Sequence, residues 1–191
     1  ITGASSGIGQ GAAVALAQTG AHVLCAARGK KRLLETVEQL LGKGWKAEAF
    51  ILDVTDQAEV KDLFSKNKID IVVNSAGLAR HSPALETSSE DFDDVMDVNL
   101  KSAYFLSSIA ARAMIKSKIK GSIIHVSSQM AYVGGIDRAV YSASKHALEG
   151  MIKSMAIEWG DKDIRINSVC PTFIRTPLTE PTFQNPERVK W

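Results

Sequence analysis

Three glycines follow a β-branched residue at the start of the chain, in the run ITGASSGIGQ. Glycine loses more conformational entropy on folding than other residues, so such a cluster indicates tight turns or a ligand that contacts the main chain. The next run, QGAAVALAQT, is rich in alanine and ends at Gly20, a favourable helix C-cap. The glycines therefore lie where a helix begins, and the apolar run AHVLCAA after it predicts a buried strand.

A strand, a glycine turn, a helix and a second strand together form a βαβ unit. The start of its helix offers unpaired N–H groups and a positive dipole end to an anion such as a pyrophosphate. A plain structural turn would contain the same glycines, and a lone glycine triplet does not separate the two. Placed between a strand and a helix, the cluster predicts nucleotide binding.

Strand-like runs alternate with helical patterns along the rest of the chain. Strands are expected at 47–53, 70–77, 121–128 and 164–171, and helices at about 30–42, 56–66, 89–116 and 138–160. Parallel neighbours need crossover connections, so this alternation predicts an α/β fold, a doubly wound parallel sheet of Rossmann type with helices on both faces. Ligands of such sheets bind beyond the carboxyl ends of the strands.

Composition restricts the expected partners. The 191 residues, of which 45% are hydrophobic, predict one domain spanning 1–191, which we expect to be a fragment lacking most of its first strand and its last strand. A formal net charge of +2 with scattered basic residues does not favour nucleic acid. No apolar stretch is long enough to predict a membrane span, so a cytoplasmic location is expected. No metal site is predicted, and Cys25 and Cys170 are expected to stay reduced and unpaired.

The run YSASKHALEG contains the most reactive pair of residues. Tyr141 and Lys145 lie four apart in a helical pattern, so both project from one face. A nearby ammonium favours phenolate, so Lys145 is expected to lower the pKa of Tyr141 and make it a general acid and base. A surface pair without chemistry has the same spacing. Ser128, at the end of a predicted strand, favours a catalytic site, because its hydroxyl can reach an oxygen that Tyr141 also touches. Ser127 is the alternative residue, and a helix cap or turn is the alternative role for Ser128.

Taken together, these motifs resemble the short-chain dehydrogenase/reductase family over nearly the whole chain. TGASSGIG (2–9) is similar to the family's TGxxxGxG motif, NSAG (74–77) to NNAG and YSASK (141–145) to YxxxK. VNL around Asn99, a serine thirteen residues before the tyrosine and PTFIRT (171–176) follow in the family's order. Ser75 departs from the second asparagine of the family, and the stretch 65–69 leaves its helix about a turn short.

The resemblance implies a role for each matching residue. Tyr141 would exchange a proton with a carbonyl oxygen, Lys145 would also hold the nicotinamide ribose, and Asn99 would anchor a water. The catalytic residues implied are Asn99, Ser128, Tyr141 and Lys145. The cofactor-binding residues implied are Gly3, Ser5, Ser6, Gly7, Ile8, Gly9, Arg28, Asp53, Val54, Asn74, Ala76, Gly77, Tyr141, Lys145, Pro171, Ile174 and Thr176.

The cofactor is expected to be NADP(H), with NAD(H) the alternative. Ala27 stands where an NAD site generally has an acidic residue, and Arg28 follows it. A guanidinium there suits a 2′-phosphate, and Lys30 and Lys31 are expected to add positive potential. Arg28 at the solvated start of the next helix is the other interpretation.

The expected function is the interconversion of a small ketone and a secondary alcohol, with a sugar acid or polyol as the favoured substrate. The alternatives are a 3-oxoacyl thioester reductase and a catalytically silent nucleotide sensor. Gln129, His81 and Arg138 would contact a hydroxylated or acidic substrate, or be solvated. The resemblance implies the strand order 3-2-1-4-5-6-7 and a homotetramer or homodimer formed through the helices near 99–116 and 138–160.

Overall fold

A parallel sheet forms the centre of the computed structural model, which describes residues 1–186; residues 187–191 of the predicted domain lie outside it. The strands are β1 (Val23–Ala27), β2 (Ala47–Ile51), β3 (Ile71–Asn74), β4 (Ser122–Val126) and β5 (Arg165–Val169). β1 pairs with β2, and β4 lies between β3 and β5, all in parallel. Thr2 bridges Ala26 and Asn74, which joins the two groups. The order β2-β1-Thr2-β3-β4-β5 confirms the doubly wound prediction, with Thr2 in the place of the first strand.

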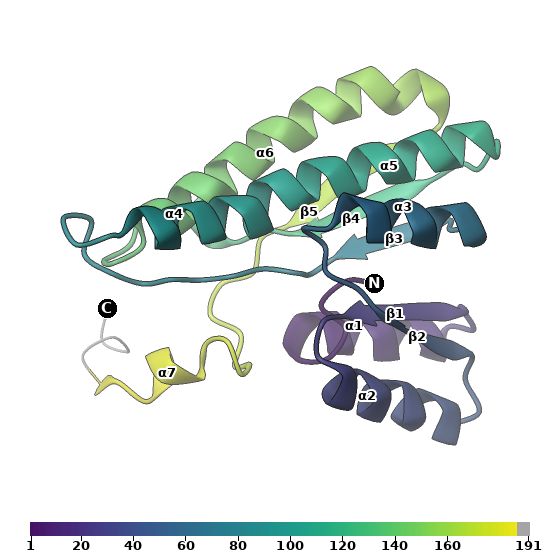
Figure 1. Ribbon diagram of the computed structural model, residues 1–191, viewed down its shortest axis with the longest axis horizontal. Coiled ribbons are helices and arrows are strands. Elements are labelled where there is room, and N and C mark those ends of the chain that lie inside the picture. The colour runs from purple at the N-terminus through teal and green to yellow at the C-terminus, as the bar shows by residue number, and fades with distance from the viewer. Residues whose placement is uncertain (187–191) are drawn as a thin grey trace.

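Helices cover both faces of the sheet. They are α1 (Gly7–Gln18), α2 (Lys30–Gly42), α3 (Gln57–Lys66), α4 (Ser89–Met96), α5 (Ser102–Lys116), α6 (Ala139–Trp159) and α7 (Glu180–Phe183). Figure 1 shows α1 and α2 beside β1 and β2 on one face, and α3 to α6 on the other. No helix of the described residues is long and apolar enough to cross a membrane.

Two apolar clusters follow from this layering. One, with Leu106, Ile123 and Leu148 at its centre, packs the sheet against α5 and α6. The other packs α1 and α2 against β1, where Cys25 and Leu33 are fully buried. Burying a leucine side chain contributes about 2 kcal/mol to folding, so these clusters hold the strand ends in fixed positions. Cys25 and Cys170 are both free.

The helix predicted at 89–116 is interrupted. A π-helix, Asp97–Lys101, separates α4 from α5 and carries Asn99, which is buried. The wider π turn accommodates an inserted residue, and such turns are frequent at functional sites. The periodicity of the sequence did not reveal it, because the flanking helices continue on both sides.

The strand predicted at 121–128 ends two residues early. β4 ends at Val126, and Ser127 and Ser128 leave the ladder. Ser128 then caps a short 3₁₀ helix, Gln129–Ala131, by accepting a hydrogen bond from the Met130 N–H at 3.1 Å. The polar end of the strand is therefore turned toward the carboxyl edge of the sheet.

Candidate active site

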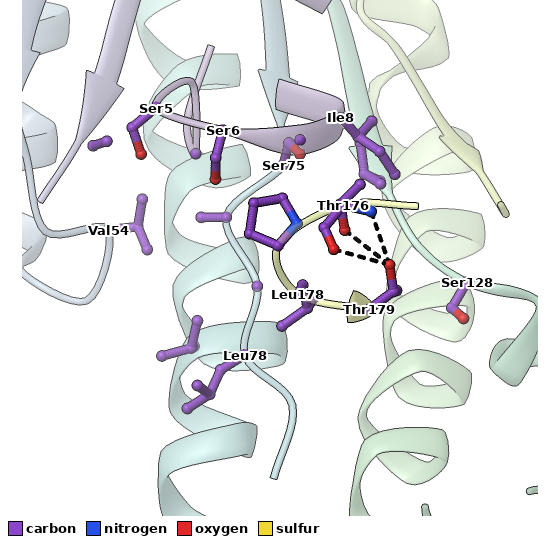
Figure 2. A pocket seen from close by; sticks show the side chains of 18 of the residues that line it. Ser5, Ser6, Ile8, Val54, Ser75, Leu78, Ser128, Thr176, Leu178 and Thr179 are labelled. Carbon is purple, nitrogen blue, oxygen red and sulfur yellow. Dashed lines mark hydrogen bonds between the residues drawn. The ribbon is translucent and has the colours of Figure 1, made fainter. Parts of the chain in front are cut away.

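A cavity of about 630 Å³ opens at the carboxyl edge of the sheet. Its walls come from the glycine turn, the ends of β1, β3 and β4, helix α6 and the segment after β5. Figure 2 shows Ser5, Ser6 and Ile8 on one side and Thr176, Leu178 and Thr179 opposite them. In the second of these groups, the Thr179 hydroxyl accepts a hydrogen bond from the Thr176 N–H at 2.9 Å. Segments distant in sequence thus enclose one ligand-sized space.

The glycine turn leaves main chain exposed where a side chain would collide. Gly3 adopts a left-handed conformation with φ 64°, and a Cβ there would lie 2.7 Å from the carbonyl oxygen of Ser75. A Cβ on Gly9 would meet the carbonyl oxygen of Gly3. Ser6 caps α1 without a side-chain hydrogen bond, so the first N–H groups of this helix stay available. This cradle fits the pyrophosphate of a dinucleotide.

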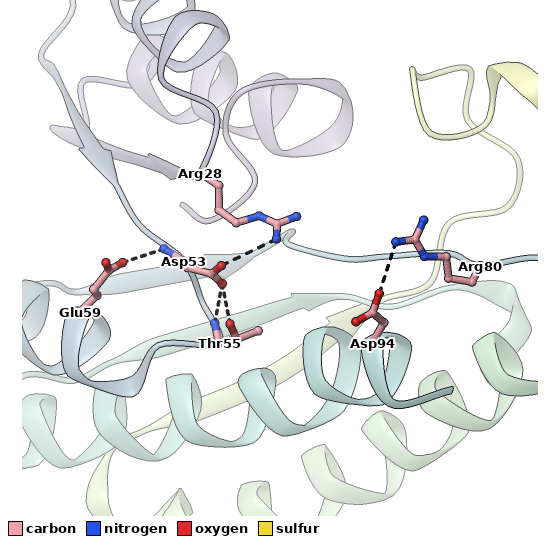
Figure 3. Close-up of polar contacts among 6 residues, drawn as sticks. All are labelled: Arg28, Asp53, Thr55, Glu59, Arg80 and Asp94. Carbon is pink, nitrogen blue, oxygen red and sulfur yellow. Dashed lines mark hydrogen bonds and ion pairs between the residues drawn. The ribbon is translucent and has the colours of Figure 1, made fainter. Parts of the chain in front are cut away.

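Arg28 lies at the mouth of the cavity beside Asp53. Their side chains form an ion pair at 3.7 Å, and Asp53 also accepts from the N–H and the hydroxyl of Thr55 (Figure 3). Burial raises the pKa of Asp53, but the hydrogen bonds from Thr55 and the charge of Arg28 outweigh it and hold that pKa below its usual value. Arg28 remains 70% exposed. A phosphate placed in this corner of the cavity would compete with Asp53 for the guanidinium.

The second cation of this corner differs from the prediction. Arg32, on the first turn of α2, lines the cavity, whereas Lys30 and Lys31 do not. Both lysines are exposed, so they can act on this corner only through their positive potential. On the other side of the same edge, Arg80 pairs with Asp94 at 3.3 Å and so ties the segment after β3 to α4 (Figure 3).

Asn74 supports the site from behind the cavity. Its Oδ1 accepts from the Thr2 hydroxyl at 2.6 Å, and its Nδ2 lies 3.1 Å from Nδ1 of His125 in β4. The Thr2 oxygen in turn accepts from the N–H of Ala76 at 3.2 Å. These bonds fix the end of β3 against the glycine turn. Ser75, the departure from the family's motif, lines the cavity itself.

Ser128, Tyr141 and Lys145 meet at the inner end of the cavity. Lys145 Nζ lies 5.7 Å from the centroid of the Tyr141 ring and donates to the carbonyl oxygen of Val126 at 3.1 Å. Ser128 lies near enough to Tyr141 to act on the pKa of its hydroxyl. Ser127 also lines the cavity, but Ser128 is the serine that contacts the tyrosine. Ser128 also caps the 3₁₀ helix, so the cap interpretation is confirmed, and its catalytic role stays a prediction.

The predicted lowering of the Tyr141 pKa does not occur in this state. Burial raises the pKa of Tyr141, while the hydrogen bond with Ser128 and the charge of Arg138 only partly oppose it. Burial also lowers the pKa of Lys145 to about 8, against the negative charges of Cys170 and Glu149. The spacing of Tyr141 and Lys145 correctly predicted that both project from one face of the helix. It gave no information on how deeply that face is buried.

The side chain of Asn99 is fully engaged. Its Oδ1 accepts from the Leu78 N–H at 2.8 Å, and its Nδ2 donates to the Leu78 carbonyl at 2.9 Å and to the Ser144 hydroxyl at 3.1 Å. It therefore joins the π-helix, the segment after β3 and α6. A water held by Asn99, as the resemblance implies, would have to bind its main chain.

Most of the predicted site residues line the cavity. Gly9, Asn74 and Asn99 do not. Gly9 packs against Gly3, Asn99 bonds to Leu78, and Asn74 acts through Thr2, which bonds to Ala76. The predicted residues that do are Gly3, Ser5, Ser6, Gly7, Ile8, Arg28, Asp53, Val54, Ala76, Gly77, Ser128, Tyr141, Lys145, Pro171, Ile174 and Thr176. Sequence reasoning missed several lining residues, including Arg32, Leu78, Val98, Leu178 and Thr179. A basic residue one turn into the helix after β1 was the available signal for Arg32.

A smaller hollow of about 60 Å³ adjoins Tyr141 on the side away from Lys145. Gln129, His81 and Arg138 line it, as does Phe173. Arg138 Nη1 lies 2.7 Å from Nε2 of His81, and its guanidinium lies 5.3 Å from the centre of the Phe173 ring. The three residues predicted either to contact the substrate or to be solvated thus line one hollow together with Tyr141.

A dinucleotide cradle and a Ser–Tyr–Lys constellation on a doubly wound sheet define a class of nicotinamide-dependent oxidoreductases. Residues 1–187 match the protein family described as short chain dehydrogenase. The chain belongs to this family, and it is an oxidoreductase of the dehydrogenase/reductase type.

Several relatives have established names. The chain is 37% identical over 185 residues to 3-oxoacyl-(acyl-carrier-protein) reductase of Thermotoga maritima, covering 94% of this chain and 75% of the relative. It is 36% identical over 192 residues to 2-dehydro-3-deoxy-D-gluconate 5-dehydrogenase of Bacillus subtilis, covering 98% and 75%. The chain thus spans about three quarters of each relative.

Solved structures agree in fold. A putative NAD(P)-dependent gluconate 5-dehydrogenase from Beutenbergia cavernae, with bound NADP at low occupancy, superposes with a TM-score of 0.95 at 33% identity, over 99% of this chain and 77% of that one. A 4-hydroxyisoleucine dehydrogenase complexed with NADH gives a TM-score of 0.89 at 34% identity, over 100% and 79%. Fold similarity alone therefore does not distinguish the two nicotinamide cofactors.

Proposed function

We propose that the chain transfers hydride between NADP(H) and a small ketone or secondary alcohol, with Ser128, Tyr141 and Lys145 as catalytic residues. The observation that carries this proposal is the convergence of these three side chains in the cavity that the glycine turn closes at its other end. The nicotinamide would supply or accept the hydride. The protein would supply the proton, the orientation and the dry surroundings.

The proton would pass through Tyr141. Ser128 accepts from the Met130 N–H, and its own O–H, which acts on Tyr141 in the structure, would donate to a substrate oxygen placed between the two hydroxyls. Tyr141 would give its proton to that oxygen during reduction and recover it during oxidation. Lys145 uses one N–H for Val126, which leaves two for the ribose hydroxyls and the tyrosine oxygen. Asn99 would hold the segment after β3 in register.

The cofactor assignment rests on the end of β1. Arg28 and Arg32 both line the cavity there, and Ala27 leaves no carboxylate at the position where one would repel a 2′-phosphate. Planar guanidinium groups bind phosphate oxygens in pairs. The bound NADP of the Beutenbergia cavernae structure supports the same cofactor for this chain.

The substrate class follows from the hollow beside Tyr141. Arg138 and Gln129 offer donors to hydroxyl or carboxylate oxygens, which favours a sugar acid or a related hydroxy acid over an apolar ketone. The Bacillus subtilis relative carries the name of such an enzyme. The name of the Thermotoga maritima relative makes a 3-oxoacyl thioester the second candidate.

The proposed assembly is a homodimer or homotetramer in the cytoplasm. A groove of about 620 Å³ between α5 and α6 is lined by Tyr104, Phe105, Met151 and Trp159 among others. Leu148 and Ile152 of the same helix are buried in the protomer's own core, whereas Met155, also buried, contributes to the floor of the groove. Tyr104 is 49% exposed, so the groove can still pair with a second copy. Light scattering at micromolar concentration should show a dimer or larger species; a monomer would contradict this assembly.

Activity measurements test the proposed reaction. NADPH oxidation is followed by absorbance with keto sugar acids, neutral keto sugars and 3-oxoacyl thioesters, each with the wild-type chain and with Tyr141→Phe. We expect turnover of a keto acid that the phenylalanine variant loses. Turnover of the thioesters alone would mean that a 3-oxoacyl thioester, and not a sugar acid, is the substrate. NADPH binding without turnover of any substrate of the three classes would contradict the catalytic proposal.

A further inference from the structure

A buried carboxylate lies one helical turn beyond Lys145, and the roles proposed above leave it without a function. Glu149 follows Lys145 by four residues on α6, so both side chains project from one face of the helix. Glu149 is 6% exposed and Lys145 is 4% exposed. Charged side chains are seldom buried this deeply unless the surrounding groups compensate them.

Three donors from outside α6 hold the Glu149 carboxylate. Its Oε2 accepts from the Ser168 hydroxyl at 2.9 Å and from the Tyr132 hydroxyl at 3.2 Å. Its Oε1 accepts from the Cys170 thiol at 3.6 Å. Ser168 and Cys170 lie at the end of β5, so the carboxylate is turned toward that strand. The ammonium of Lys145 points instead at the Val126 carbonyl.

The ionisable groups around Lys145 differ in whether they are charged at neutral pH. Burial raises the pKa of Glu149, but hydrogen bonds from groups that include Ser168 and Tyr132 outweigh it, so the pKa of Glu149 lies below its usual value and the carboxylate is ionised at neutral pH. Burial lowers the pKa of His125 to about 4, and it raises the pKa of Tyr141, so both are neutral there. The Cys170 thiol donates to Glu149 Oε1, so it carries its proton in this arrangement. Glu149 is therefore the group near Lys145 that carries a negative charge at neutral pH.

We propose that Glu149 is a positioning residue of the active site, the fixed counter-charge that keeps the buried ammonium of Lys145 protonated. Its three donors keep it turned toward β5. The remaining N–H bonds of Lys145 thus stay available to the cofactor ribose and to Tyr141. This inference rests on the role proposed for Lys145. It also gives Tyr132 and Ser168 a role, because they hold the Glu149 carboxylate in position.

The test follows Lys145 in the cofactor-free protein by NMR of isotope-labelled lysine side chains, with Lys145→Arg identifying the resonance. All variants carry Cys170→Ser, which keeps a donor near Glu149 but cannot form a thiolate. Glu149→Gln should lower the titration midpoint of Lys145 by about one pH unit or more, because it removes an opposite charge that favours the charged form of the ammonium. Glu38→Gln, which removes an exposed carboxylate on α2, should leave the midpoint unchanged.

An unchanged midpoint in folded Glu149→Gln protein would overturn the inference. If circular dichroism shows that this variant does not fold, Glu149→Leu removes the same charge and buries no amide, and an unchanged midpoint there counts equally against it. Fluorescence titration with NADPH across pH then separates the two proposals. Binding that is lost at a lower pH in Glu149→Gln supports the counter-charge. A shifted midpoint with unaltered pH dependence of binding contradicts the ribose contact of Lys145 instead.

Discussion

The amide nitrogen of Asn74 lies 3.1 Å from Nδ1 of His125, and both side chains are buried. Because an amide nitrogen only donates, Nδ1 must accept, and the proton of the neutral ring belongs on Nε2, which lies 2.8 Å from the Ser107 hydroxyl. The Ser107 hydroxyl itself donates a hydrogen bond to the Ala103 carbonyl oxygen at 2.8 Å. One chain of hydrogen bonds thus runs from the glycine turn through β3 and β4 to α5, and it requires a neutral histidine.

Acid should therefore destabilise the fold through His125. Burial lowers the pKa of His125 from 6.5 to about 4. Between these two pH values the unfolded chain therefore binds a proton at His125 and the native chain does not. The stability contributed by the neutral ring is complete above pH 6.5 and is lost as the pH falls through about 4. The difference amounts to about 3 kcal/mol. Urea unfolding measured from pH 7.5 to pH 4.5 should show most of this decline.

The control for this decline is His125→Gln, which keeps an acceptor for Asn74 and a donor for Ser107 but cannot titrate. Its stability should fall less between pH 6.5 and pH 4.5 than that of the wild-type chain. Parallel declines in the two proteins would assign the acid sensitivity to carboxylates elsewhere.

Replacing Tyr141 by phenylalanine should abolish turnover and leave NADPH binding within about twofold. The change removes the transferable proton and little packing, because the ring stays in place. Steady-state kinetics and fluorescence titration measure the two effects separately. More than a few per cent of residual activity would mean that another group supplies the proton.

Replacing Lys145 by alanine should impair both binding and turnover. The ammonium is the cation beside Tyr141, and it carries the N–H groups assigned to the ribose. We expect the KM for NADPH to rise at least tenfold and kcat to fall, since a hydrogen bond from a charged group contributes about 2 kcal/mol. Unchanged KM with reduced kcat would restrict Lys145 to the proton transfer.

Two neighbouring glycines of α1 should respond oppositely to alanine. In Gly9→Ala the new methyl group would meet the Gly3 carbonyl, so the turn must open and NADPH affinity should fall at least tenfold. In Gly11→Ala no atom lies within 4 Å of the added Cβ, and the helix should gain up to about 1 kcal/mol of stability. Thermal unfolding and NADPH titration of both variants check this contrast. Equal effects would contradict the packing assigned to Gly9.

The sequence predicted those parts of the site that depend on regular spacing. The glycine turn, the helices at 30–42 and 138–160, and the joint position of Tyr141 and Lys145 follow from periodicity and from residue type. Each is fixed by interactions between residues close together in the chain, and such interactions leave a pattern in the sequence.

Features that depend on tertiary contacts were not predictable in this way. The π-helix carries Asn99, whose side chain bonds to Leu78 and Ser144, both distant in sequence. The pKa of Tyr141 rises because of burial that no spacing encodes. In the sequence, nothing distinguishes Glu149 from a polar residue on an exposed helical turn. Its buried environment depends on contacts with Ser168 and Tyr132, which only the fold brings to it.

The choice of nicotinamide cofactor should depend on Arg28. Its guanidinium is paired weakly with Asp53, at 3.7 Å and largely in solvent, so a 2′-phosphate can displace that contact at little cost. The ratio of kcat/KM for NADPH to that for NADH should exceed one in the wild-type chain. Arg28→Asp should lower this ratio at least tenfold, chiefly through the KM for NADPH, because it replaces an attraction by a repulsion.

Lys30→Asp provides the matched control for this change. It reverses the same charge two residues further on, at a side chain that does not line the cavity, so it should alter the ratio only slightly and less still at high salt. An equal loss in both variants would mean that general potential, and not a direct contact, selects the phosphate. A wild-type chain that works more efficiently with NADH would refute the NADP(H) assignment, and Arg32 would then have to be explained as a surface residue of α2.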